Sequence, residues 1–225
     1  MKSQVRGGTR WKRFAVVMVP SVAATAAIGV GLAQGALAAS FSISGQEFKV
    51  RADKLVGNGF VQYGSVAAGK TLTDQQFAAP VAVSGFDNAK IYGMCQSVVT
   101  PKVPFVGDVT LQLNAGTDDK RPVEATGLYL DVSDLKADAE FTNIDIGVAA
   151  GSADKNEKGE KLPGRPGIQP GTEHKANGNG FAQRAETATL TNVRQKAWAT
   201  TAATFKLPNL SLSLHRGTSA ECFKD

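Results

Sequence analysis

Few side chains in this sequence have the types and spacing that catalysis requires. Hydrolysis by a serine nucleophile needs a serine, a histidine and a carboxylate within hydrogen-bond reach of one another. No serine stands in the Gly-x-Ser-x-Gly pattern that exposes the nucleophile of many esterases. The stretch Gly107-Asp108-Val109-Thr110-Leu111 lacks the serine of a Gly-Asp-Ser-Leu motif. Only His174 and His215 are available as a base. We therefore predict no catalytic residue.

Metal ligands are equally sparse. Two distant histidines and two cysteines do not have the spacing of a zinc site. Four aspartates lie near one another in the sequence, Asp131, Asp134, Asp138 and Asp145. An EF-hand loop spaces its oxygen ligands differently, and a solvated strand face explains these carboxylates more simply. We predict neither a metal nor a cofactor.

Cys95 and Cys222 are the only cysteines. An isolated pair in an exported protein usually forms a disulfide. A bridge across so long a loop contributes about 4–5 kcal/mol in the chain-entropy model, less any strain. We expect this disulfide, with two free thiols as the alternative.

The first 38 residues have the organisation of a secretory signal peptide. Five basic residues precede or open an apolar stretch that runs from Phe14 to Leu32, and small residues follow at Ala36-Leu37-Ala38. This order predicts export with cleavage after Ala38. The alternative is an uncleaved membrane anchor, because the stretch from Phe14 to Ala33 is long enough to span a bilayer.

The charge of the remaining chain excludes one class of partner. Of 25 basic residues, five lie in the leader, which leaves as many basic as acidic residues in 39–225. A neutral chain without a basic cluster lacks the electrostatic footprint of a nucleic-acid-binding protein. We expect no nucleic-acid partner.

Apolar residues recur at every second position after the leader. This alternation is clear in residues 48–52, 109–113, 128–132, 144–148 and 210–214. A period of two is typical of antiparallel strands with one buried and one wet face. Asp131 to Phe141 and Val193 to Thr204 also suit short helices, but we favour strand. The predicted core comprises Phe48, Val50, Phe60, Ile91, Val109, Leu111, Leu113, Leu128, Leu130, Phe141, Ile144, Ile146, Trp198, Phe205, Leu210 and Leu212.

The sequence predicts one all-β domain, residues 39–225, made of serial antiparallel hairpins. A faint fourfold repeat covers roughly residues 48–69, 86–116, 130–151 and 190–217. About eight strands would form either a curled sheet or a two-layer sandwich. Residues 151–180 are rich in glycine and proline and nearly free of apolar side chains. We expect a mobile loop there.

Three stretches carry a resemblance to a known family. They are residues 107–116 (GDVTLQLNAG), residues 126–131 (TGLYLD) and the tail from Leu210 to Cys222. In these the whole chain resembles a family of exported proteins of unknown function from filamentous, Streptomyces-like actinobacteria. Members often carry the label cholesterol esterase. The resemblance implies a setting outside a Gram-positive cell, and it transfers no catalytic residue.

We weigh three functions for a secreted β domain of this kind. The first is binding of a lipid or other apolar ligand at the cell exterior, since small inward residues can leave a cavity in a curled sheet. The alanines concerned are Ala52, Ala125, Ala137, Ala139, Ala199 and Ala203. The second is a structural or adhesive role in the cell envelope, with a partner there. The third is the lipid-ester hydrolase that the family label implies.

Overall fold

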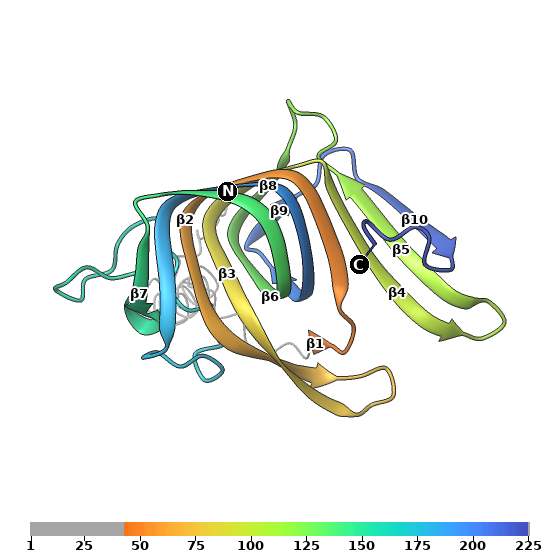
Figure 1. Ribbon diagram of the computed structural model, residues 1–225, viewed down its shortest axis with the longest axis horizontal. Coiled ribbons are helices and arrows are strands. Elements are labelled where there is room, and N and C mark those ends of the chain that lie inside the picture. Colours follow the sequence, from red (N-terminus) through yellow and green to blue (C-terminus); the bar gives the residue numbers. More distant parts are fainter. Residues whose placement is uncertain (1–42, 225) are drawn as a thin grey trace, which may run out of the picture.

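The computed structural model describes residues 43–224, so the predicted signal peptide, residues 1–38, lies outside the described residues. The described chain consists mostly of strands, which confirms the all-β prediction (Figure 1). The strands are β1 (Ile43–Ser44), β2 (Phe48–Lys70), β3 (Gln76–Tyr92), β4 (Met94–Val103), β5 (Gly107–Ala115), β6 (Val123–Thr142), β7 (Asp145–Ala149), β8 (Phe181–Thr201), β9 (Thr204–Lys206) and β10 (Ser211–Arg216). A short 3₁₀ turn, η2 (Ala150–Ser152), follows β7. Among residues 43–224 no helix has the length and hydropathy of a membrane span.

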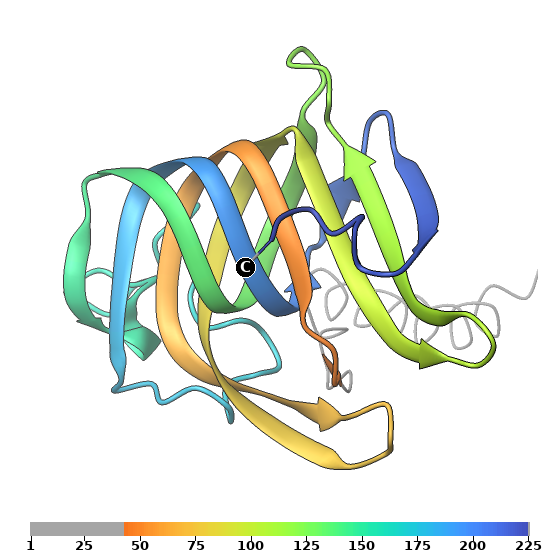
Figure 2. The same cartoon turned by 45° about the vertical axis from the view of Figure 1, so that its right-hand side comes forward.

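Four long strands form a closed ring. Antiparallel pairing joins β2 to β3, β3 to β6, β6 to β8, and β8 back to β2. Paired residues can be followed from Gly64 of β2 across β3, β6 and β8. They lead back to a different residue of β2, Phe48, which measures the stagger of the ring. Because the register is staggered so far, the strands tilt steeply and wind as a coil (Figure 2). The predicted curled sheet is therefore present, and it is a single closed sheet.

Three strands form a flap beside the ring. After Gly93, the chain of β3 continues into β4, which pairs with Lys49–Arg51 of β2 along one edge and with β5 along the other. Strand β10 pairs with the other edge of β5 (Figure 1). We call β4, β5 and β10 the flap. Short strands complete the sheet: β1 pairs in parallel with β2, β9 with β6, and β7 with β8.

The predicted disulfide is confirmed. Cys95 of β4 and Cys222 of the C-terminal tail are bonded, with their Cα atoms 5.8 Å apart. The bridge holds the tail against one face of the flap. The same contact is reinforced by an ion pair of 3.1 Å between Lys49 of β2 and Glu221 of the tail.

The apolar residues separate into an interior and an outer cluster. The interior cluster fills much of the ring and includes Leu55, Phe60, Phe86, Leu128 and Leu190. The outer cluster lies between the sheet and residues 150–176, and it includes Val61, Tyr63, Tyr129, Ala150 and Ala153. Both faces of the ring thus carry buried side chains, which is why β8 has few exposed positions.

The predicted core was partly wrong. Val50, Phe60, Ile91, Leu128 and Leu130 are buried as expected. The exposed fractions of Ile146, Phe205, Leu210 and Leu212 are 66%, 36%, 51% and 60%. These four residues lie on short strands or at strand ends near the margins of the sheet, where no further layer of the described chain covers them. Alternation alone marked a face as apolar without showing that the face is covered.

The long strands change the phase of their alternation at a shared position. Leu55 and Phe60 of β2 both face the interior, although strict alternation would place them on opposite faces. Gly59 lies just before Phe60 and has a positive φ of 61°. In β6, Gly127, with a φ of 55°, likewise separates the interior residues Ala125 and Leu128. Gly59 and Gly127 lie at the same level of the sheet, since Phe86 of the intervening β3 pairs with both Phe60 and Leu128. The sheet therefore bends there without losing its register.

We expect Gly59→Ala to destabilise the fold, whereas Gly64→Ala should not. An alanine Cβ at position 59 would lie 2.0 Å from the carbonyl oxygen of Gly164 and would adopt a left-handed conformation. The conformation alone costs about 1–2 kcal/mol. At Gly64 a Cβ meets nothing within 4 Å. Urea unfolding of both variants measures the difference, and equal losses would contradict this account.

Candidate ligand cavity inside the ring

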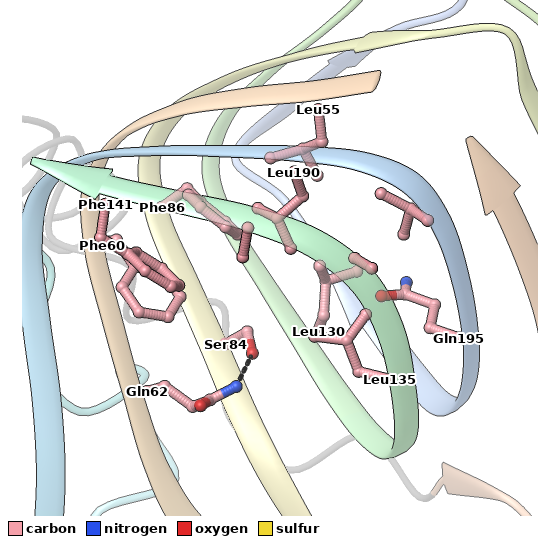
Figure 3. A pocket seen from close by; sticks show the side chains of 13 residues that line it. Leu55, Phe60, Gln62, Ser84, Phe86, Leu130, Leu135, Phe141, Leu190 and Gln195 are labelled. Carbon is pink, nitrogen blue, oxygen red and sulfur yellow. Dashed lines mark hydrogen bonds between the residues drawn. The ribbon is translucent and has the colours of Figure 1, made fainter. Parts of the chain in front are cut away.

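An apolar cavity lies within the ring (Figure 3). Its volume is about 140 Å³. All four ring strands contribute to its wall, and every lining residue is uncharged. The lining residues are Leu55, Phe60, Gln62, Ser84, Phe86, Leu130, Leu135, Ala137, Ala139, Phe141, Leu190, Val193 and Gln195.

Three phenylalanine rings from three different strands form one side of the cavity. The ring of Phe60 lies 5.4 Å from that of Phe86 and 5.1 Å from that of Phe141, centroid to centroid. The ring of Phe86 packs closely over Gly57, where an added Cβ would lie 2.2 Å from it. A glycine at position 57 therefore allows the side chain of Phe86 to lie against β2, and the centre of the four-stranded ring stays open.

Polar side chains occupy the wall beside the phenylalanines. Gln62 Nε2 donates a hydrogen bond of 2.9 Å to Ser84 Oγ (Figure 3). Gln183 Nε2 donates one of 2.7 Å to Gln62 Oε1, which fixes the orientation of that amide. Gln195, only 7% exposed, lines the cavity from β8. The amide of Gln195 can donate to and accept from a neutral polar group.

The cavity opens along the second half of β6. Pairing of β6 with β3 ends at Val132, so the later residues of β6 are paired on the β8 side only. Leu135, Ala137, Ala139 and Phe141 line the cavity from this half. Leu135 is 37% exposed and gives the opening an apolar rim.

The size of the cavity limits what it can enclose. An apolar protein cavity of about 150 Å³ is large enough to bind benzene. A space of 140 Å³ therefore suits one ring or a short branched chain. Any larger molecule must extend through the opening over β6.

A second, more polar cleft lies outside the ring, beneath residues 161–170. Its volume is about 480 Å³, and charges of both signs line it, including Asp87, Asp154, Lys161 and Arg165. Within it, Lys161 pairs with Asp154 at 3.6 Å, and Arg165 pairs with Glu186 at 3.2 Å. The two ion pairs do not neutralise every charge of the cleft, because Asp87 accepts only a hydrogen bond from Asn88, and Arg165 Nη1 is buried with no hydrogen-bond partner among the described residues.

Two buried tyrosines hold residues 151–180 against the outer face of the sheet. The Tyr63 hydroxyl accepts a hydrogen bond of 2.7 Å from the Gln169 amide, and the Tyr129 hydroxyl donates one of 3.4 Å to the Gly167 carbonyl. Burial raises the pKa of Tyr63 to about 12 and also raises the pKa of Tyr129. Both phenols are therefore neutral at physiological pH. The mobility predicted for this segment stays a prediction, but its anchoring contacts are specific.

The histidines and aspartates considered from the sequence do not form a site. His174 is exposed in the loop. The ring of His215 lies 2.8 Å from Ser213 Oγ, both on β10, and no carboxylate of residues 43–224 bonds to that histidine. Asp138 accepts a hydrogen bond from Asn192, and Asp145 pairs with Arg184. No group of potential metal ligands occurs among the described residues.

One comparison with known proteins identifies the family. The profile of a family of unknown function, DUF6230, matches residues 44–223. The chain belongs to this family. No curated protein and no solved structure matches it. The matched range spans the whole ring and the flap of this DUF6230 chain.

The small residues predicted to line a cavity in the DUF6230 chain are distributed more widely than expected. Ala137 and Ala139 line the cavity, and Ala52 and Ala125 belong to the interior cluster. Ala199 belongs to the outer cluster, and Ala203 is exposed.

Sequence reasoning missed the polar wall. Gln62 follows Phe60 by two positions, Ser84 precedes Phe86 by two, and Gln195 follows Val193 by two. Each polar residue is thus in phase with a buried apolar neighbour. This shared phase indicated that the three polar side chains face the interior of the sheet.

We expect Tyr63→Phe to loosen residues 151–180. The substitution leaves the Gln169 amide, in a residue 4% exposed, without its acceptor. A buried unpaired donor costs about 1–3 kcal/mol. Hydrogen exchange of the Gln169 amide should quicken. Tyr129→Phe is the control, since its longer hydrogen bond is weaker, and unchanged exchange in Tyr63→Phe would refute the anchoring role.

Asp131→Asn tests a half-buried carboxylate near Lys175 of the same loop. Burial raises the pKa of Asp131 above its ordinary value of 3.8, an effect that Lys175 opposes. The folded state therefore binds this proton more tightly than the unfolded state, so ionisation destabilises the fold above the raised pKa. We expect the variant to be more stable at pH 7 and to lose this advantage by pH 3. Urea unfolding at both pH values decides, and an advantage that grows toward low pH would contradict the prediction.

Proposed function

We propose that this protein binds an apolar molecule with a neutral polar end inside the closed ring, at the exterior of the cell. The observation that supports the proposal is the open cavity in which an apolar wall of three phenylalanines meets the side chains of Gln62, Ser84 and Gln195. Apolar pockets with a few convergent polar groups are the usual form of small-molecule sites.

The absence of charge from the lining selects against ionised ligands. A carboxylate or ammonium group moved from water into such a wall loses its hydration without gaining an opposite charge. An alcohol, amide, ketone or ester can instead exchange hydrogen bonds with Gln195 or with the Gln62–Ser84 pair. The proposed ligand is therefore a neutral lipid or a similar small apolar molecule.

The setting outside the cell is part of the proposal. It is supported by the leader in the sequence, by the Cys95–Cys222 disulfide, and by the resemblance to exported actinobacterial proteins. Hydrolysis of a lipid ester is not part of it. The Ser213–His215 pair has no carboxylate partner among the described residues, and neither residue lines the cavity.

Two probes of nearly equal shape test the charge preference. We expect 4-butylbenzyl alcohol to bind and 4-butylbenzoate, which is ionised at pH 7, to bind at least about tenfold more weakly. Isothermal titration calorimetry on the exported chain measures both. Equal affinities, or stronger binding of the benzoate, would overturn the neutral-ligand proposal.

A pair of variants on adjacent residues of β6 tests the location. Ala137→Phe places a phenyl ring in a space of about the size that holds one, and it should abolish binding of the alcohol. Lys136→Phe is the control, because the exposed Lys136 does not line the cavity. Thermal unfolding confirms that both variants fold. Leu135→Asn, at the half-exposed rim, should weaken binding without disturbing the core. If Ala137→Phe still binds the alcohol, the assignment of the binding site to this cavity is wrong.

A further inference from the structure

The two faces of the flap differ in chemistry. Directly paired residues of an antiparallel sheet lie on the same face. One row of the flap is Leu214–Leu111–Val98, and the next is Leu212–Leu113–Gln96. The alternate rows, on the opposite face, are His215–Thr110–Val99 and Ser213–Gln112–Ser97. The row Arg216–Val109–Thr100 lies on the same face as the leucines and places one cation at its end. The flap therefore has a mainly apolar face and a mainly polar face.

The C-terminal tail covers the polar face. Thr110 Oγ1 donates a hydrogen bond of 2.6 Å to the Gly217 carbonyl, and Gln112 Nε2 donates one of 2.9 Å to the Ala220 carbonyl. The Cys222 amide donates one of 3.0 Å to Ser97 Oγ. Thr110 and Ser97 are buried as a result. The tail thus covers the polar face of the flap, whereas a sheet ordinarily has its apolar face covered.

The apolar face stays open at its outer strand. Leu212 and Leu214 of β10 are 60% and 68% exposed. On the inner strand this face runs into the interior of the ring, since Met94, two residues before Gln96, belongs to the interior cluster. The flap strands thus continue the sheet beside the ring (Figure 2), and their apolar face adjoins the interior of the ring at Met94.

The turn between β4 and β5 adds a second apolar feature. Phe105 is fully exposed, at 106%, and Val106 is 39% exposed. Phe105 also has a positive φ of 64°. The side chain of Phe105 is fully exposed and its backbone is in the left-handed conformation, so this residue contributes no packing energy to the described fold. The fold itself therefore does not explain why a phenylalanine stands there.

We propose that the flap docks on the surface of a lipid bilayer, with Phe105 and the open leucines of β10 entering the apolar layer. A second copy of the chain, paired along the free edge of β10, would extend the sheet and leave the face that carries Leu212 and Leu214 uncovered. That copy would leave Phe105 uncovered, because the β4–β5 turn lies beyond β5, away from that edge. A lipid surface accommodates the turn and the strand face together.

The charges near the turn fit a neutral lipid surface. The Lys102 amide donates a hydrogen bond to Asp108, and the two side chains offset each other in charge across the turn. Arg216 is the other cation of the flap strands beside this turn. Because there is no cluster of basic residues, docking should not require anionic headgroups. The docking stands whether or not the cavity holds a ligand.

Sedimentation with phosphatidylcholine vesicles tests the proposal on the exported chain, whose N-terminus is fixed by its denatured mass. Phe105→Asn removes the ring while keeping a residue type that tolerates positive φ. We expect it to lower the vesicle partition constant about tenfold or more. Leu72→Asn is the control, because Leu72 is 58% exposed in the turn after β2. It should leave partitioning unchanged.

If the leader is retained and itself binds vesicles, sedimentation no longer reports on the flap alone. A fluorescent residue at position 105 then reports on the flap directly. Phe105→Trp should show a blue-shifted emission when vesicles are added, and Leu72→Trp should not. Docking is overturned if Phe105→Asn partitions like the wild type and Phe105→Trp shows no shift. It is also overturned if Leu72→Asn lowers partitioning equally. A dimer that ignores vesicles and dissociates on Leu212→Ser would replace the lipid surface with a second copy.

Discussion

The pairing of β2 with β8 is the contact on which the rest of this fold depends. It runs from Phe48 with Ala197 to Tyr63 with Ala182, and it joins segments that are far apart in the sequence. Without it, β2, β3, β6 and β8 would form an open sheet with two long unpaired edges. Closure gives the sheet an inside, and the cavity exists only because this inside is wider than its side chains can fill.

Closure also decides the role of the outer face. With one surface turned inward, residues such as Val61 and Tyr63 face outward and need a cover. Residues 151–180 supply it, although they are poor in apolar side chains. Hydrogen bonds between backbone groups and buried tyrosine hydroxyls provide the specificity that a larger apolar contact would otherwise give.

The flap shows the same alternation with the opposite outcome. Inside the ring, Leu128 and Leu130 are buried by the strands that face them across the interior. In the flap, Leu212 and Leu214 have no facing strand, because β10 lies at the margin of the sheet. The disulfide fixes the tail on the other side, where it shields Ser97 and Thr110. The covalent link therefore determines which face of the flap is covered, and it leaves the apolar one open.

The sequence by itself determined the strands, the disulfide and the neutrality of residues 39–225. Alternation with a period of two is a local property, so residues 48–52 or 128–132 could be assigned to strands without knowing their partners. Two lone cysteines allow only one intramolecular pair. The tertiary structure decided closure, the cavity and the exposure of Leu210 and Leu212. These depend on which strands meet, on a staggered register, and on phase changes at Gly59 and Gly127. Alternation assigns side chains to two faces of a strand, but only the packing of distant strands decides which face is buried.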